Sequence, residues 1–580
     1  MSQSSDPTGI SWLNACLALQ NVNCGVNKIV HNYNSVRVPV RTNLNILKIR
    51  KLLHNYEDVQ VCDFLEFGWP INHDRSIVPK HCGANYKGVD EYLAQVDLYL
   101  GKELDRGSAI GPFEANPFNG KNTFVQIGVS PLNAIKKKGT SEPRIILDLS
   151  WPKGRGINDC ISTDSYLGEQ ITTTYPSIDE LVDAVKLKGK GCLLFKKDLK
   201  KAYRQIPVDP LDVPLLGYKW RGKFYFDTSL PMGMRSSAHI CQRVSCAVVH
   251  VTTRKGFRVV NYLDDFAGAE SVRDANASYE FLGKVLSDFG LRESVDKARS
   301  PATQMSFLGV QFDTVKSTLE VTEERLEEIK SLLDLWSQKL VMTRNELESL
   351  VGKLMFVSKC VRSARVFMSR MLNCLRELPN GRSVAVDGEM KLDLAWWSTF
   401  LSRFNGVVMM PMQNWSRPDS VIAVDACSTG IGGICWETNE VFHLQLPEQF
   451  LARNLHINQL EALCVVIALK LWHHHVRNKK ILVYSDNMVT VQVFNSGKSH
   501  NPYLQECLRE AAFLLCRQEA ELRTVHVAGV ENRVPDFLSR WHTKRSYEAL
   551  FWNEMVQMGK VHVIKEVTVD ESLLELKNTW

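Results

Sequence analysis

The sequence predicts an α+β protein of several domains, and three features of the chain support that class. Its 580 residues exceed a single domain, because one domain takes roughly 100–200 residues. Apolar runs of strand length alternate with helical patterns in two regions, and the stretch between them is almost entirely helical in pattern. We predict an N-terminal extension at 1–80, an α+β region at 81–315, a helical region at 316–415, an α/β region at 416–545 and a tail at 546–580.

The elements of the first α+β region follow from their periodicity. Residues 85–107 have apolar side chains at helical spacing, and residues 123–150 predict two strands around a basic turn. Strand-like runs occupy 191–199 and 256–270, and a helical pattern at 236–256 lies between them.

The second half of the chain changes pattern three times. A predicted hairpin at 305–322 is followed by helical patterns from 323 to 404. Residues 406–420 are rich in turn signals and predict a linker. Beyond the linker the predicted order is strand, strand, helix, strand, helix, which is typical of an α/β domain.

Composition and charge indicate a globular protein that contacts a polyanion. Hydrophobic residues make up 44% of the chain, and no run approaches the roughly 18 apolar residues of a membrane helix, so we expect no membrane contact. The net charge is +6, and lysines cluster in "IKKKG" and "KLKGKGCLLFKKDLKKAYR", although a solvated charged face is the simpler explanation of any one run. The 15 cysteines form no C-x-x-C pair, and the N-terminus lacks a signal-peptide pattern. We expect an intracellular protein of the cytoplasm or nucleus.

Two adjacent carboxylates, Asp264 and Asp265, follow the strand-like run "FRVVNYL". Acids are depleted in strands, and like charges this close repel each other, so a polar hairpin turn is one explanation. A third acid, Asp198, ends another apolar strand. Together the three acids suit a site for two Mg²⁺ ions, because magnesium prefers carboxylate and phosphate oxygens and its charge relieves the repulsion.

These residues resemble the motifs of reverse transcriptases. Asp198 precedes Tyr203 by five positions, and "LPMGMRSSAHICQ", "YLDD" and "FLGV" follow in the order found in that family. The resemblance implies a right-hand polymerase fold with fingers, palm and a helical thumb and connection. It also implies a site made of the metal ligands Asp198, Asp264 and Asp265, the nucleotide-binding residues Lys137, Arg144, Tyr203, Met232, Gly233 and Lys297, and the primer grip Phe307, Leu308 and Gly309.

The chain departs from the family at one position of the nucleotide-binding loop. Many retroviral enzymes have Leu-Pro-Gln-Gly where this chain has Leu230, Pro231, Met232 and Gly233. Methionine has no amide group that could donate a hydrogen bond. The departure puts in doubt a polar contact between position 232 and the nucleotide, while several retrotransposon lineages carry an apolar residue there.

Four further acids lie at the ends or starts of elements in the C-terminal region. They are Asp425, Glu461, Asp486 and Asp536. Each alone is more often a helix cap or a solvated acid, but together they suit a second two-metal site that hydrolyses a phosphodiester. The set resembles ribonuclease H, and the resemblance implies an α/β ribonuclease H-like domain in which His526 assists proton transfer or product release.

Four segments are most similar to the DIRS order of retrotransposons: "CDFLEFGWPINHD", "IILDLSWPKGRGIND", "ELESLVGKLMFVSKCV" and "INQLEALCVVIALKLW". Caulimovirus-like and gypsy-like enzymes share the core motifs. The implied function is RNA-directed and DNA-directed DNA synthesis together with degradation of the RNA strand of the hybrid. The implied partners are an RNA template, a DNA primer, the RNA–DNA hybrid and dNTPs, with a recombinase encoded separately by the same element. The implied cofactor is Mg²⁺, two ions per site, with Mn²⁺ as a substitute. The alternative is a domesticated nucleic-acid-binding protein that has lost catalysis.

Overall fold

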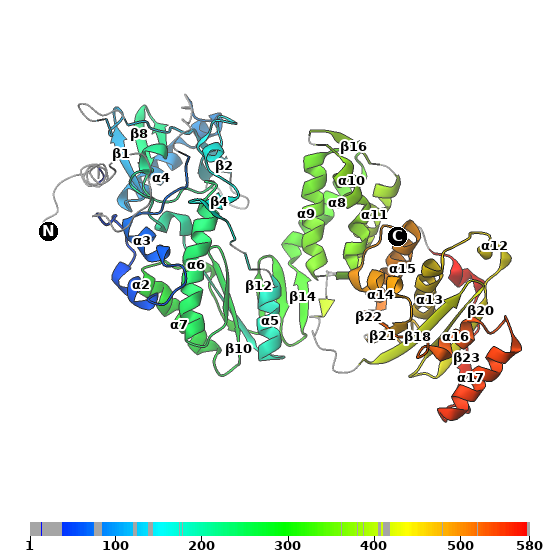
Figure 1. Ribbon diagram of the computed structural model, residues 1–580. Helices are drawn as coiled ribbons and strands as arrows, with labels where there is room; N and C mark the ends of the chain where they lie inside the picture. Colours follow the sequence, from blue (N-terminus) through cyan, green and yellow to red (C-terminus); the bar gives the residue numbers. More distant parts are fainter. Residues whose placement is uncertain are drawn as a thin grey trace. The chain divides into compact units, whose positions relative to one another are not determined.

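A computed structural model defines the fold (Figure 1). It describes Leu13 and residues 38–74, 84–119, 125–136, 143–172, 175–176, 178–360, 362–379, 381–386, 388–403, 408–409, 418–477, 479–518 and 520–576. The chain divides into two compact units, Met1–Phe307 and Leu308–Trp580. Among the described helices, none combines the length and apolarity that crossing a membrane requires.

The first unit is built around a four-stranded antiparallel sheet in the order β11-β6-β10-β9. The strands are β6 (Leu193–Asp198), β9 (Val259–Tyr262), β10 (Asp265–Glu270) and β11 (Arg299–Ala302). Helices α5 (Ile178–Lys188), α6 (Ser237–Arg254) and α7 (Ala275–Phe289) pack against it (Figure 1). Gly268 lies opposite Phe195, and a Cβ atom at Gly268 would meet the Phe195 ring at 2.2 Å, so the close pairing of β6 and β10 requires glycine there.

A second part of the first unit contains the elements predicted before residue 150 and an additional sheet. Helix α4 (Leu93–Asp105), preceded by η1 (Lys87–Tyr92), confirms the predicted helix. The antiparallel strands β2 (Leu132–Lys136) and β3 (Pro143–Leu147) confirm the predicted strand pair. The additional sheet has the order β1-β8-β7, with β1 (Ala109–Phe113), β7 (Gly217–Trp220) and β8 (Lys223–Asp227).

Residues 38–74 fall within the segment predicted as an extension, and they pack into the core of the first unit. Helices α2 (Ile46–Leu52) and α3 (Gln60–Phe67) supply buried side chains to that core, among them Ile49 and Phe64. The backbone N–H of Asn45 donates to the carbonyl of Phe289 at the end of α7. These contacts make residues 38–74 part of the globular unit.

The second unit begins with a hairpin and a helical segment, as predicted. Strands β13 (Val310–Asp313) and β14 (Thr318–Val321) pair in antiparallel fashion, and β14 also pairs with the short strand β17 (Val408–Met409). The helical segment consists of α8 (Glu323–Ser337), α9 (Arg344–Cys360), η6 (Arg362–Met368), α10 (Ser369–Glu377) and α11 (Gly388–Arg403). A short pair of strands, β15 (Val341–Thr343) and β16 (Ser383–Ala385), interrupts it.

The rest of the second unit is a six-stranded mixed sheet in the order β22-β21-β18-β19-β20-β23. Its strands are β18 (Ser420–Cys427), β19 (Gly430–Cys435), β20 (Glu440–Gln445), β21 (Lys480–Ser485), β22 (Glu521–His526) and β23 (Lys565–Glu566). Its helices are α12 (Glu448–Leu451), α13 (Ile457–Leu471), α14 (Met488–Ser496), α15 (Pro502–Gln518), α16 (Arg533–Ser539) and α17 (Arg545–Gln557). Strands β18, β21 and β22 run parallel to one another, and α13 and α16 both pack on β18 and β19.

Residues beyond the predicted boundary at 545 extend this same domain. Strand β23 pairs in parallel with β20 at the edge of the sheet. Phe551 and Met555 of α17 are fully buried in a core that also includes Ala423 of β18. The segment predicted as a tail therefore contributes a helix and an edge strand.

Candidate active sites

The first site lies where β6 and β10 bring three carboxylates together. Asp198 is the last residue of β6, and the register places it opposite Asp265 of β10. Asp264 occupies the turn between β9 and β10, and its carbonyl accepts a hydrogen bond of 2.9 Å from the N–H of Leu199. The pairing of two strands that are distant in sequence thus assembles the acid cluster predicted from the motifs.

Burial and mutual repulsion disfavour the charged forms of these acids. Burial raises the pKa of Asp265 to about 6, with a further contribution from the Asp198 carboxylate. Burial and the same neighbour also raise the pKa of Asp264. Two lysines offset part of the negative charge: Lys297 Nζ lies 3.1 Å from each Asp198 oxygen, and Lys196 Nζ lies 3.0 Å from Asp265 Oδ1. An all-carboxylate donor set of this kind suits a hard divalent cation.

Tyr203 belongs to the short helix η3 (Ala202–Gln205), which follows β6 after a short turn. The tyrosine is half-buried against the core of the first unit. Burial raises the pKa of its hydroxyl, and the Asp264 carboxylate contributes in the same direction, which places the ring in the electrostatic range of the acid cluster. The proximity of Tyr203 to the bound nucleotide stays a prediction.

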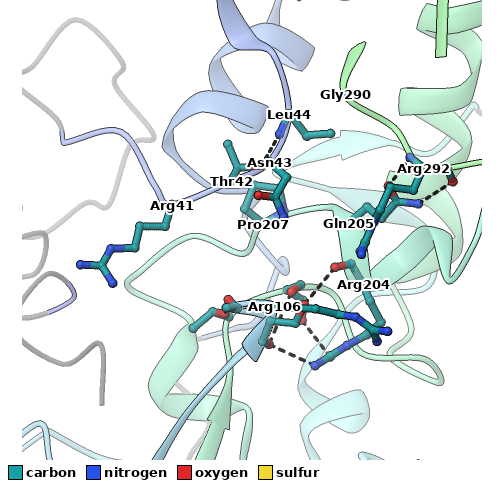
Figure 2. Close-up of a pocket in the computed structure, with 14 residues that line it drawn as sticks. Arg41, Thr42, Asn43, Leu44, Arg106, Arg204, Gln205, Pro207, Gly290 and Arg292 are labelled. Atoms are coloured by element: carbon teal, nitrogen blue, oxygen red, sulfur yellow. Dashed lines mark hydrogen bonds between the residues drawn. The ribbon is translucent and has the colours of Figure 1, made fainter. Parts of the chain in front are cut away.

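Arg204, the residue after Tyr203, binds η3 to three neighbouring segments through its guanidinium. Its guanidinium pairs with both oxygens of Asp227 at 2.7 and 2.9 Å and with Glu103 at 2.8 Å, and it donates to the carbonyl of Ser108. Figure 2 shows Arg204 in the wall of a pocket of about 40 Å³. In the same view Gln205 is bonded to the backbone of Arg292, with its side chain both donating and accepting. These bonds fix η3 to the surrounding backbone.

The loop that contains Met232 and Gly233 is held by a residue that the motifs did not indicate. The side-chain amide of Asn158 donates to the carbonyl of Gly233 at 2.9 Å, and its oxygen accepts from the N–H of Arg235 at 2.8 Å. Gly233 has a φ of +91°, which favours glycine. Met232 is 53% exposed, so its side chain is accessible beside the loop.

The remaining residues predicted for this site belong to other elements of the chain. Arg144 is exposed on β3, and Lys137 lies outside the described residues. Phe307 is buried at the end of β12 (Gln304–Phe307), which closes the first unit. Leu308 and Gly309 begin the second unit with φ values of +49° and +80°.

The second site lies in the six-stranded sheet. Asp425 is in β18, Glu461 is in α13, and Asp486 directly follows β21. Each of the three offers a ligand atom, and these atoms lie within 4.8 Å of one another, a grouping that the described residues show only here. Glu461 accepts from the N–H of Ala426 at 3.0 Å, so the helix residue is tied to the strand that carries Asp425.

Burial and neighbouring acids strongly perturb this triad. Burial, with contributions from Asp486 and Asp536, raises the pKa of Asp425 to about 7. Burial and the Asp425 carboxylate raise the pKa of Glu461 well above its ordinary value, and burial raises that of Asp486. The donors are all carboxylates, and the close packing of their oxygens is costly without a cation, so the residues fit a divalent metal site.

Asp536 and His526 lie beside the triad. Asp536, on α16, pairs with Arg540 at 2.6 Å. His526 ends β22 opposite Ser485, and its Nε2 lies 3.1 Å from the carbonyl of Asp486. The fold thus gathers the predicted histidine and acids at one edge of the sheet.

Two features of this site were not predicted. The Ser539 hydroxyl donates to Asp425 Oδ2 at 2.5 Å, and Arg540 pairs with Asp536. A Cβ atom at Gly432, the residue opposite Asp425, would lie 2.5 Å from atoms of Leu538 and Ser539, so this glycine allows α16 to approach β19. The signal available in the sequence was the "GIGG" run together with "LSR" directly after Asp536 and Phe537.

Two parts of the chain match known family models. Residues 135–312 match the family described as reverse transcriptase (RNA-dependent DNA polymerase). Residues 417–514 match the RNase H-like domain found in reverse transcriptase. The chain therefore has a reverse transcriptase domain followed by an RNase H-like domain, and both are families that generally use divalent metals.

Two polyproteins are similar to the chain over 71% of its length. Polyprotein P3 of Commelina yellow mottle virus is 19% identical over 423 residues, and the retrovirus-related Pol polyprotein from transposon 297 of Drosophila melanogaster is 21% identical over 436 residues. The matched regions cover 20% and 36% of these relatives, respectively, so the chain spans a minor part of each. The chain is homologous to retrotransposon Pol polyproteins.

Solved structures of foamy viral protease–reverse transcriptases are also similar to the chain. One, in complex with double-stranded DNA, is 14% identical with a TM-score of 0.46, and the match covers 84% of this chain and 83% of that one. Another, in complex with an RNA/DNA hybrid, is 14% identical with a TM-score of 0.44, and the match covers 84% of this chain and 64% of that one.

Proposed function

We propose that this protein copies retrotransposon RNA into DNA, as an RNA-directed and DNA-directed DNA polymerase, and degrades the RNA strand of the resulting hybrid. The observation that carries the proposal is that acids gather in each unit: Asp198 lies opposite Asp265 in the first, and ligand atoms of Asp425, Glu461 and Asp486 lie within 4.8 Å of one another in the second. Each cluster lies in a domain whose family performs the corresponding reaction. The substrates would be an RNA template, a DNA primer, dNTPs and the RNA–DNA hybrid.

In the polymerase site, Asp198, Asp264 and Asp265 would hold two Mg²⁺ ions, or Mn²⁺ in their place. The ions would stabilise negative charge on the attacking and leaving oxygens of phosphoryl transfer. The ammonium of Lys297 already lies against Asp198, where it can donate a proton to the pyrophosphate that leaves. This arrangement supports the role that the family resemblance implies for Lys297.

Other residues of the polymerase site would bind and select the nucleotide. Lys137 and Arg144 would contact the triphosphate, and Met232 and Gly233 would belong to the nucleotide-binding loop. Tyr203 would fill the space beneath the sugar and exclude a 2′-hydroxyl, the group that distinguishes RNA from DNA. The primer grip Phe307, Leu308 and Gly309 would hold the primer end.

In the hydrolytic site, Asp425, Glu461, Asp486 and Asp536 would hold the metal ions. Ser539 orients the Asp425 carboxylate by donating to one of its oxygens. His526 lies at the rim of the site, where it can transfer a proton or assist product release. Because His526 is exposed, its ring can move without disturbing the core.

The experiment is a pair of single substitutions in the full chain, tested for primer extension on an RNA template and for cleavage of RNA in a hybrid. Asp264→Asn should abolish extension and spare cleavage, and Asp486→Asn should do the reverse, because the acids belong to different units. Asp334→Asn, which changes an exposed acid of α8, should leave both activities unchanged.

Loss of both activities from either single change in folded protein would contradict the two-site proposal. Absence of extension by well-folded wild-type protein, together with tight duplex binding, would instead support the catalytically silent binding protein.

The finer lineage is also a proposal: we infer a DIRS-order element, acting inside the cell in the cytoplasm or nucleus, with a recombinase encoded separately. The support is the sequence of segments such as "CDFLEFGWPINHD" and "ELESLVGKLMFVSKCV". Sequencing the DNA that flanks the coding region tests it. A neighbouring tyrosine-recombinase reading frame is expected, and an integrase frame in its place would refute the assignment.

A further inference from the structure

The turn that carries Asp264 adopts an unfavourable backbone conformation. Leu263, directly before Asp264, has a φ of +55°, in the left-handed region that residues with a side chain rarely occupy. The Leu263 side chain packs partly against the core of the first unit. A conformation of this kind persists only where the surroundings hold it in place.

Two side chains of α6 hold the backbone of Leu263 on both sides of its Cα atom. The Leu263 N–H donates to Gln242 Oε1 at 2.8 Å. The Ser245 hydroxyl donates to the Leu263 carbonyl at 2.5 Å. Gln242 and Ser245 are three residues apart and therefore lie on the same face of the helix.

Both side chains are fully buried, and Gln242 Nε2 also donates to Cys246 Sγ at 3.5 Å on the same helix. A buried serine in a helix ordinarily donates to a carbonyl of its own preceding turn. Thr252, further along the same helix and equally buried, does so by donating to the Val249 carbonyl at 2.7 Å. The Ser245 hydroxyl donates instead to the carbonyl of Leu263, and the Gln242 side-chain oxygen accepts from the Leu263 N–H. The Gln242 side-chain oxygen and the Ser245 hydroxyl therefore lose these hydrogen bonds if the turn changes its shape.

The same turn is bonded to the strand that carries the other metal ligand. The Asp264 carbonyl accepts from the N–H of Leu199, the residue after Asp198. Helix α6 itself begins directly after the nucleotide-binding loop, and Ser237 in its first turn donates to the Pro231 carbonyl at 2.8 Å. One helix thus contacts both the nucleotide-binding loop and the acidic turn.

We propose that Gln242 and Ser245 are positioning residues of the polymerase site. They hold Leu263 in its left-handed conformation, which fixes the Asp264 carboxylate relative to Asp198. Neither residue touches the nucleotide or the reacting atoms. The proposal rests on the polymerase function proposed above for the same acids.

A first experiment measures the turn without requiring activity. Hydrogen exchange is followed by mass spectrometry in peptides that cover residues 258–268 of the full chain. Gln242→Leu removes the acceptor of the Leu263 N–H at similar volume, and Ser245→Ala removes the donor to its carbonyl. We expect exchange in the turn to accelerate roughly tenfold or more, because local opening determines exchange of a bonded amide. Thr252→Val, the matched control, should leave exchange in the turn unchanged.

A second experiment measures primer extension as a function of Mg²⁺ and dNTP concentration. The two variants should lower kcat by roughly 10- to 100-fold, since small misplacements of a catalytic group have effects of that size. The Mg²⁺ concentration at half-maximal rate should rise, whereas the KM for dNTP should stay within about twofold of wild type because the nucleotide contacts are intact. Ser245→Thr keeps the hydroxyl and should restore kcat. Cleavage of the RNA strand, performed by the other unit, serves as the folding control.

The results of the two experiments distinguish failure of the positioning role from failure of the polymerase function on which it rests. If the wild type extends primers and the two variants match it in kcat, Mg²⁺ dependence and exchange of the turn, the positioning role is wrong. If Thr252→Val shows the same losses, the effect is one of general stability, and the proposal is again wrong. If the wild type does not extend primers but Gln242→Leu still accelerates exchange in the turn, the polymerase function fails while the hold on Leu263 stands.

Discussion

Asp425→Asn should stabilise the protein in the absence of metal, although it removes a ligand of the hydrolytic site. Asp425 is buried among acids, and these surroundings raise its pKa to about 7 from an ordinary 3.8. A carboxyl group whose pKa is higher in the folded state favours folding most at low pH. That contribution is lost as the pH rises from about 4 through about 7, because the unfolded chain ionises first. At pH 7.5 the ionised group therefore opposes folding.

The expected gain in the free energy of unfolding follows from how far the pKa of Asp425 is raised. Each pKa unit corresponds to about 1.4 kcal/mol, so a shift of roughly three units gives an upper limit of about 4 kcal/mol. Relaxation of the site and entry of water lower this limit, and we expect a gain of about 1–3 kcal/mol in the free energy of unfolding. Asparagine keeps an oxygen that can accept from the Ser539 hydroxyl, so no hydrogen bond is lost.

The assay is thermal unfolding of the full chain in EDTA at pH 7.5 and at pH 4.5. The transition of the second unit should rise by several degrees in Asp425→Asn at pH 7.5, since 1 kcal/mol shifts Tm by roughly 2–4 °C in a unit of this size. The gain should shrink at pH 4.5. Added Mg²⁺ should raise the Tm of the wild type and have a much smaller effect on the variant.

Ser539→Ala provides a control of opposite sign. The Ser539 hydroxyl stabilises the ionised form of Asp425 and lowers its pKa, so its removal should destabilise the metal-free protein at pH 7.5. Destabilisation by Asp425→Asn in EDTA at pH 7.5 would refute the reasoning, because it would mean that the ionised carboxylate is net favourable in its site.

Three further predictions concern the polymerase site. Tyr203→Val should raise kcat/KM for ribonucleotides relative to deoxyribonucleotides on one primer–template, and an unchanged ratio with lowered stability would make Tyr203 only a core residue. Asn158→Ala should raise the KM for dNTP severalfold in steady-state extension, because the loop at Gly233 loses both bonds to that side chain; an unchanged KM would show that the loop holds its shape alone. Neutralising Arg144 or Lys137 to Gln should impair nucleotide use more than template binding, and a change in duplex affinity alone would assign these residues to backbone binding.

The motifs indicated acids that the fold brings near one another, because these acids follow local patterns in the sequence. Asp198 and Asp486 end or follow apolar strands, and Asp264 follows another, and apolar runs of strand length make such strands visible in the sequence. The helical segment near the start of the second unit was equally visible from its spacing. Such signals depend only on neighbours within a few positions along the chain.

The tertiary structure decided which residues far apart in the sequence contact each other. Asn158 bonds to Gly233, Lys196 faces Asp265, and Ser539 reaches Asp425. Each of these contacts depends on strand register, on a close helix approach, or on the path of a distant loop. A one-residue change of register would turn Lys196 to the other face of its sheet, and no local pattern specifies that choice.

The sequence by itself indicated the strands and helices around the acids and which acids stand at their ends, because periodicity and turn chemistry are local properties of the chain. The tertiary structure alone decided that residues 38–74 join the core of the first unit, that β23 extends the C-terminal sheet, and that buried Gln242 and Ser245 face the turn at Leu263. The physical reason is that a buried polar group or an edge strand gains its partner only after distant segments have packed together, so its role follows from the packing and not from the residues beside it.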